Sequence, residues 1–163
     1  MLRLAMLVIC AASSAQALCD DAEKLVMSCT LKDASQALDV CHQQGEARYR
    51  YGPRNGAPEL KLSTSIRDLE YRPWAGVGGS IYEEVAFYNG DIRYAVWSAF
   101  ERDPEGNYPL SGGVIVTKGD QTLADLTCDT GSVNTAMDTL FEEKQARGLC
   151  WDSVNFAWKP CAE

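Results

Sequence analysis

Nucleophilic catalysis by a serine or a cysteine would have to use His42, because this is the only histidine of the chain. His42 directly follows Cys41 on a predicted strand, where successive side chains point to opposite faces. The two residues therefore cannot act as a pair, and we expect an exposed or lightly hydrogen-bonded histidine. A metal site needs clustered histidine, cysteine or carboxylate ligands. The chain has no second histidine and no Cys-x-x-Cys pair, so we predict no metal site and no cofactor.

The string Asp129-Thr130-Gly131-Ser132 contains the signature of aspartic proteases, which bring two such loops together so that two carboxylates share a proton. This chain holds one copy, so an enzyme of that type would have to dimerise. Its flanks also differ, since Cys128 replaces an aliphatic residue. We favour a structural role, in which Asp129 and Gly131 form a turn and Ser132 caps a following helix.

Two adjacent glutamates, Glu83 and Glu84, lie in a predicted strand at 81–88. Glu83 shares its face with the apolar residues of this strand, so its carboxylate is directed toward the core. A carboxylate in the core must be paired or protonated, and Arg72 or Arg93 could pair with it. Structural pairing is favoured over catalysis, because ion pairs in the core perturb carboxylates as active sites do. We therefore predict no catalytic residue.

A glycine-rich loop at 72–80 carries one large aromatic side chain, Trp74. Its glycines lack the third position of a dinucleotide fingerprint, so the loop does not predict a phosphate site. An aromatic residue on such a loop is either a binding anchor or a plug for the end of the sheet. We take Arg72, Trp74 and Glu83 as the candidate binding residues.

Residues 1–17 have the three parts of a secretory signal peptide. Arg3 gives the positive start, residues 4–12 the short apolar stretch, and Ala15-Gln16-Ala17 the cleavage site. The apolar stretch is shorter than the roughly 20 residues that span a bilayer, and no later stretch is longer. We predict a periplasmic or secreted protein with one domain at 18–163 and no membrane span.

Of the 7 cysteines, Cys10 falls within the signal segment and the other six follow it. An even set of cysteines behind an export signal indicates a disulfide framework. Six cysteines can form disulfides in several combinations, and the predicted hairpins and helix favour one of these combinations. The predicted bridges are Cys29–Cys41, Cys128–Cys150 and Cys19–Cys161.

The chain is acidic, with 23 Asp+Glu against 15 Lys+Arg and a net charge of −8. Such a chain repels nucleic acid and anionic lipid, both of which are bound through lysine and arginine. It would attract a basic protein partner and raise the encounter rate, or the charge keeps an exported protein in solution. We predict no nucleic-acid partner.

Short strands separated by turns predict a mainly β fold, an antiparallel sandwich or a small barrel. The clearest signal is Asn89-Gly90, which favours a two-residue hairpin turn. One amphipathic helix is predicted at about 133–147, followed by Gly148 as terminator. The aromatic tail after it is predicted to pack as a last strand or an ordered loop. The predicted strands are 25–31, 36–42, 46–51, 59–64, 81–88, 92–100, 113–117 and 122–128.

Several strings together resemble an uncharacterised family of secreted or periplasmic proteins of Gram-negative bacteria. Among them are Tyr71-Arg72-Pro73-Trp74-Ala75-Gly76-Val77-Gly78 and Leu126-Thr127-Cys128-Asp129-Thr130-Gly131-Ser132. The resemblance implies an exported protein of one domain and implies no activity. A looser likeness, at the level of fold and charge, links the chain to periplasmic inhibitors of C-type lysozyme, which are small disulfide-bearing β-barrels.

These observations predict a non-enzymatic, exported binding protein of the bacterial cell envelope. The most specific version of this prediction is an acidic inhibitor of a basic cell-wall hydrolase. The alternatives are a small secreted hydrolase that uses Glu83, Glu84 or Asp129, and an envelope protein with a purely structural role.

Overall fold

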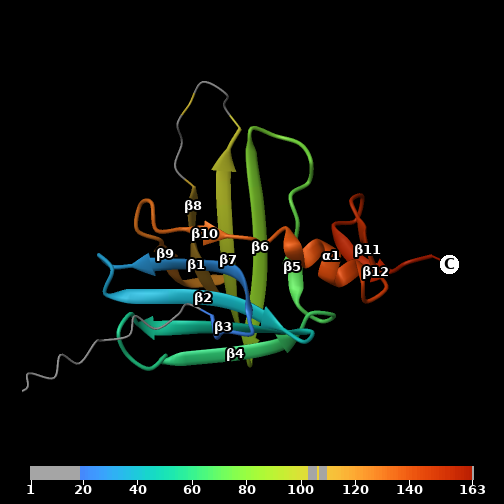
Figure 1. The fold of residues 1–163 in the computed structure, drawn as a ribbon. Coiled ribbons are helices and arrows are strands. Elements are labelled where there is room, and N and C mark those ends of the chain that lie inside the picture. The colour runs from blue at the N-terminus through green and yellow to red at the C-terminus, as the bar shows by residue number, and fades with distance from the viewer. Residues whose placement is uncertain (1–18, 103–105, 107–109, 163) are drawn as a thin grey trace, which may run out of the picture.

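The computed structural model describes residues 19–102, 106 and 110–162, and the signal segment predicted at 1–17 lies outside these residues. The described chain forms two five-stranded antiparallel sheets, a two-stranded hairpin and one short helix (Figure 1). The predicted mainly β fold is therefore confirmed. No helix among the described residues is long and apolar enough to cross a bilayer.

The first sheet has the strand order β10-β1-β2-β3-β4 and the second the order β5-β6-β7-β8-β9. The first consists of β1 (Lys24–Leu31), β2 (Gln36–Gln43), β3 (Glu46–Pro53), β4 (Leu60–Ser65) and the two-residue β10 (Asn134–Thr135). The second consists of β5 (Glu70–Arg72), β6 (Ser80–Asn89), β7 (Ile92–Glu101), β8 (Ser111–Lys118) and β9 (Gln121–Thr127).

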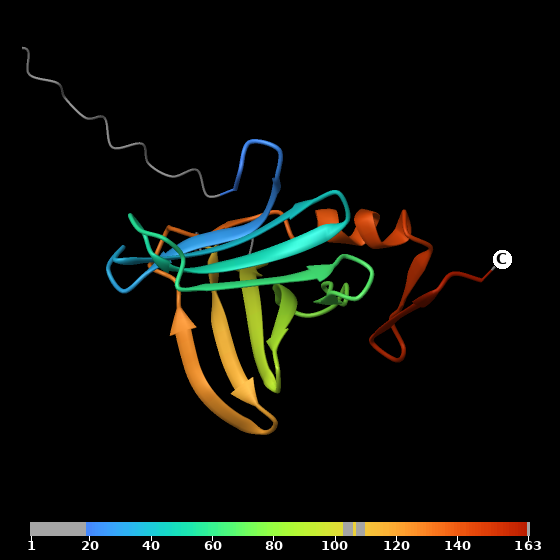
Figure 2. The same ribbon diagram turned by 90° about the horizontal axis from the view of Figure 1, so that it is seen from below.

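The strands of the two sheets cross steeply, and the sheets face each other as two layers (Figures 1 and 2). The core lies between them and includes Val40 and Tyr49 from the first sheet and Phe87 and Val96 from the second. The rings of Tyr49 and Phe87 meet with their centroids 5.7 Å apart. Burial of these alternating apolar residues is what holds the layers together.

The hairpin of β6 and β7 is confirmed, with a shift of one residue in its turn. Asn89 pairs with Ile92, so the two loop residues are Gly90 and Asp91. Gly90 has a φ of 62°. Glycine at the first loop position suits a turn whose twist matches the flanking strands.

The helix predicted at 133–147 is shorter, because α1 spans Thr139–Gln145. The backbone before it pairs with the free edge of β1 as strand β10, and the Ala136 amide donates to the carbonyl oxygen of Val26 at 2.8 Å. Ser132 does not cap the helix, since its hydroxyl donates to the carbonyl oxygen of Asp129 at 2.7 Å. Pairing with an open sheet edge has overridden the helical pattern here.

The three disulfides are Cys19–Cys41, Cys29–Cys128 and Cys150–Cys161, so all three predicted pairs, Cys29–Cys41, Cys128–Cys150 and Cys19–Cys161, are wrong. In the first hairpin Cys29 lies opposite Leu38, three residues along β2 from Cys41. Three strand residues span about 10 Å, more than a disulfide bridges. Cys29 instead crosses to the residue that follows β9 and joins the two sheets.

The C-terminal tail forms a hairpin of β11 (Leu149–Asp152) and β12 (Ala157–Pro160). The Cys150–Cys161 bridge closes its open end. This hairpin and α1 lie together at one end of the two layers, beyond the strands (Figure 2). The tail that was predicted as a last strand or ordered loop is thus a separate two-stranded unit.

Candidate functional site

A groove of about 410 Å³ lies where β5 and the residues before it face α1 and the C-terminal hairpin. We call it the hairpin groove. Its aromatic lining is Tyr71, Trp151, Phe156 and Trp158. Its charged lining is Arg67, Asp68, Glu70, Arg72, Glu84, Arg93 and Lys144. The groove therefore combines one aromatic wall with a lining that is otherwise mostly charged.

Trp158 is the centre of the aromatic wall. Its ring stacks on Tyr71 at 5.9 Å between centroids and contacts Trp151 at 5.4 Å and Phe141 at 5.2 Å. Its indole nitrogen donates a hydrogen bond of 2.7 Å to the carbonyl oxygen of Tyr71. The wall is therefore held to strand β5 by both packing and a hydrogen bond, which gives it a defined shape.

The tip of the hairpin exposes apolar side chains on an ordered turn. Val154 is 82% exposed and Phe156 is 55% exposed. The Asp152 carboxylate accepts hydrogen bonds from the Val154 amide at 3.0 Å and from Lys159 at 2.9 Å. These and the hydrogen bonds from Asn155 hold the pKa of Asp152 well below its usual range. Exposed apolar residues on a stiff turn are a feature of contact surfaces.

The opposite side of the groove is an ion-pair network in which Arg93 contacts two carboxylates. This guanidinium donates to Glu84 at 2.6 Å and to Glu70, which also accepts the hydroxyl of Tyr88. Burial alone would raise the pKa of Glu70, but the hydrogen bonds from Arg93 and Tyr88 lower it below its usual value. Both carboxylates are therefore already paired with Arg93.

Lys144 of α1 lies at the base of the groove and is 1% exposed. Its Nζ donates to the carbonyl oxygen of Arg67 at 3.2 Å and lies 5.3 Å from the centre of the Trp158 ring. Among the described residues, no carboxylate lies within 4.0 Å of this nitrogen. Burial lowers the pKa of Lys144 to about 8. Burying an ammonium group without a paired anion costs free energy of folding, so the position of Lys144 requires an explanation.

Of the three residues predicted to bind, Arg72 lines the groove, with its guanidinium 5.8 Å from the centre of the Phe156 ring. Trp74 lies outside this lining. Its indole nitrogen donates to the carbonyl oxygen of Val77 at 3.2 Å, and the guanidinium of Arg102 covers its ring at 4.8 Å. The loop is thus tied to the end of β7 by contacts within the chain.

Glu83, the third candidate, accepts a hydrogen bond of 2.6 Å from the hydroxyl of Tyr71. Burial raises the pKa of Glu83, and the nearby charge of Asp138 adds to the rise. The expected pairing with Arg72 or Arg93 is wrong, because Arg93 binds the neighbouring carboxylate of Glu84 on the other face of the strand. Glu83 lies outside the lining of the hairpin groove.

Asp129 has the structural role that its turn sequence suggested, although on a different turn. Its carboxylate accepts hydrogen bonds from the hydroxyl of Thr30 at 2.8 Å and from the amides of Asp33 and Ala34 at 3.1 and 2.8 Å. The turn between β1 and β2 is left-handed, with φ of 56° at Asp33 and 60° at Ala34. Asp129 supplies the acceptors that this unusual turn requires.

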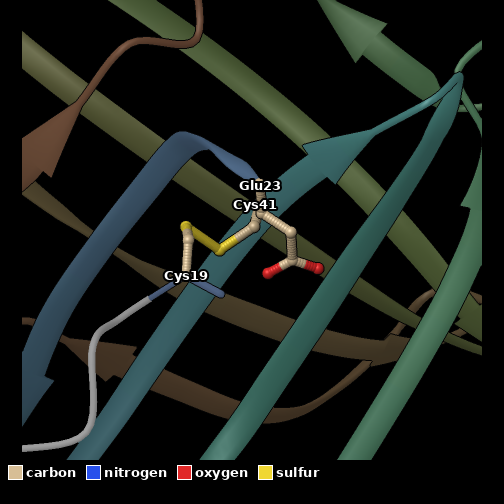
Figure 3. A group of neighbouring side chains, drawn as sticks. All are labelled: Cys19, Glu23 and Cys41. Carbon is tan, nitrogen blue, oxygen red and sulfur yellow. A yellow bond between two sulfur atoms is a disulfide. The ribbon is translucent and has the colours of Figure 1, made fainter. Parts of the chain in front are cut away.

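Cys19, Glu23 and Cys41 lie close enough together to suggest three metal ligands (Figure 3). The two sulfur atoms are bonded to each other, however, and an oxidised cysteine does not ligate a metal. The Glu23 carboxylate accepts hydrogen bonds from Arg48 at 2.9 Å and from Arg50. The cluster is a structural link between the N-terminal segment and the first sheet.

His42 and Cys41 lie on opposite faces of β2, as expected, but the histidine is 3% exposed rather than on the surface. Its Nε2 atom is buried and has no hydrogen-bond partner among the described residues. Burial lowers the pKa of His42, which favours the neutral form. These are the properties of a core residue.

Sequence reasoning missed Lys144, although the signal was present. In the helical pattern that predicted the buried stripe, position 144 follows Leu140 by four residues and Met137 by seven, so it belongs to the same face. A lysine on a buried stripe is unusual and marks a position of interest.

Comparisons with protein-family models, with curated proteins and with solved structures returned no match.

Proposed function

We propose that this chain is a non-enzymatic, exported binding protein and that its ligand-contact surface is the hairpin groove. The single observation that carries the proposal is the groove itself, an aromatic wall beside a buried lysine that has no carboxylate within 4.0 Å among the described residues. Export to a periplasmic or extracellular compartment is supported by the three disulfides and by the signal-like residues 1–17. The resemblance to secreted proteins of Gram-negative bacteria fits the same compartment.

The surroundings of the candidate carboxylates support binding over hydrolysis. Glu83 is held by Tyr71, Glu84 by Arg93, and Asp129 by the turn between β1 and β2. Glycoside hydrolysis by carboxylates uses two such groups, one on either side of the substrate bond. Each of these three is instead committed to a different structural contact.

Phe156→Ser is expected to weaken retention of an envelope component on the immobilised protein at least about tenfold, because Phe156 is a half-exposed anchor of the groove. The measurement is the amount of material from an envelope extract that elutes specifically from the column. Leu123→Ser is the matched control, since Leu123 is 46% exposed on β9, in a different part of the fold. Equal retention by both variants, or none by the wild type, contradicts the proposal.

The net charge of −8 supports a more specific partner, a basic cell-wall hydrolase that the protein would inhibit. We expect the purified protein to slow a basic lysozyme at low ionic strength, with the effect reduced several-fold in about 0.15 M salt because screening weakens surface attraction. Turnover of a cell-wall substrate is the measurement. Undiminished turnover at low salt rules out the inhibitor form and leaves the binding protein.

A further inference from the structure

Lys144 is a buried cation whose counter-ion is missing from the described chain. An ammonium group has three N–H donors, and the carbonyl oxygen of Arg67 takes one of them. The ring of Trp158 offers a further weak attraction at 5.3 Å. The charge of Asp68 acts on Lys144, but this carboxylate accepts a hydrogen bond of 2.7 Å from the hydroxyl of Ser65. Because Lys144 lines the groove, an anion in the groove would complete its coordination.

A second cation lies above the same groove. The guanidinium of Arg72 is exposed and covers Phe156, and no carboxylate lies within 4.0 Å of it among the described residues. Arginine is well suited to hold a carboxylate in the plane of its fork. Lys144 and Arg72 belong to different elements, α1 and β5, so the fold brings the two together at one site.

The charge of the groove limits the charge of what it binds. Its lining holds four cationic and three anionic side chains, which leaves one positive charge in excess. Glu70 and Glu84 share the single guanidinium of Arg93, so this part of the lining keeps a negative charge that would repel a second negative charge on a ligand. A single negative charge therefore balances the site, and a dianion such as a phosphate does not.

We propose that the hairpin groove binds a monocarboxylate carried on a ring that can stack on an aromatic face, with Lys144 and Arg72 as its counter-ions. The ring lies against the aromatic wall of Phe156 and Trp158, and the carboxylate completes the hydrogen bonds of the buried ammonium. A volume of about 410 Å³ suits a ligand of this size. The inference rests on the proposed function, because it assigns the ligand class of the same groove.

Titration of the purified protein with four probes tests the assignment. The probes are phenylacetate for an aromatic ring, glucuronate for a sugar ring, phenylacetamide as the uncharged match and inorganic phosphate as the more highly charged anion. Calorimetry measures binding. We expect saturable binding of at least one carboxylate. If phenylacetate is the one bound, we expect phenylacetamide to bind at least about tenfold more weakly. We expect phosphate to bind more weakly than the preferred carboxylate.

Lys144→Met is expected to weaken carboxylate binding at least about tenfold, because methionine fills the space of the lysine stem without its charge. Arg72→Gln tests the exposed cation by the same measurement in a variant that leaves the core unchanged. Lys118→Met is the control, an exposed lysine on β8 outside the lining of the groove.

Absence of saturable carboxylate binding, tighter binding of phosphate than of both carboxylates, or equal affinity in Lys144→Met and Lys118→Met overturns the inference. These outcomes are separate from the test of the proposed function. If probes fail while Phe156→Ser still loses the envelope component, the ligand class is wrong and the binding site stands.

Discussion

Replacing both Cys29 and Cys128 with alanine is expected to lower the free energy of unfolding by about 4 to 5 kcal/mol. The bridge joins residues 99 positions apart and links the first sheet to the end of the second. A long closed loop restricts the unfolded chain most, so its loss destabilises the fold most. Denaturant unfolding followed by circular dichroism measures the change. Because whole domains are stable by only about 5–15 kcal/mol, this variant approaches the limit of folding.

The same double replacement at Cys150 and Cys161 is the matched control. This bridge closes a loop of 11 residues, for which the loss is about 3 kcal/mol. The hairpin groove depends on this hairpin, whereas the two sheets do not. A larger loss from the short loop than from the long one would show that the bridge between the sheets is not the main constraint.

Asp39→Asn is expected to raise the free energy of unfolding at pH 8 by about 3 kcal/mol. Oδ1 of Asp39 is buried and has no hydrogen-bond partner among the described residues. Burial raises the pKa of Asp39 to about 7, although Arg50, opposite it on β3, acts to lower it. Charging this carboxylate at neutral pH therefore opposes folding, and an uncharged amide removes that cost.

The pH dependence explains why Asp39→Asn should raise rather than lower the free energy of unfolding. Between about pH 4 and 7 the folded protein keeps a proton on Asp39 that the unfolded chain has lost, so the free energy of unfolding falls as pH rises through this window. Asp39→Asn lacks that contribution. Thermal unfolding of both proteins from pH 4 to pH 8 is the measurement. We expect the two proteins to be close in stability near pH 4 and to diverge as pH rises. A gap that stays constant with pH would contradict the role of the raised pKa.

Much of the local structure was predictable from residue types. Alternation of buried and exposed residues predicted β3, where Ala47 and Tyr49 are buried and Arg48 and Arg50 are not. Turn residues predicted the hairpins, including that of β6 and β7, whose turn begins at Gly90. These patterns work because neighbouring strands impose a period of two on any sheet that has one buried face.

Elements whose state depends on distant contacts were predicted less well. The segment before α1 has a helical pattern, yet it pairs with β1, because an unpaired strand edge offers hydrogen bonds that local propensity does not foresee. The cysteine pairs failed for the same kind of reason. Sequence spacing places Cys29 near Cys41 along the chain, whereas crossing of the sheets places it beside Cys128.

By itself, the sequence determined the class of the fold, the faces on which side chains lie and the presence of an even set of cysteines. Only the tertiary structure decided that residues 67–72 meet residues 144–158 and form the hairpin groove around Lys144 and Arg72. The physical reason is that periodicity depends on neighbours along the chain. Contacts between segments more than 70 residues apart depend instead on how whole sheets pack and cross.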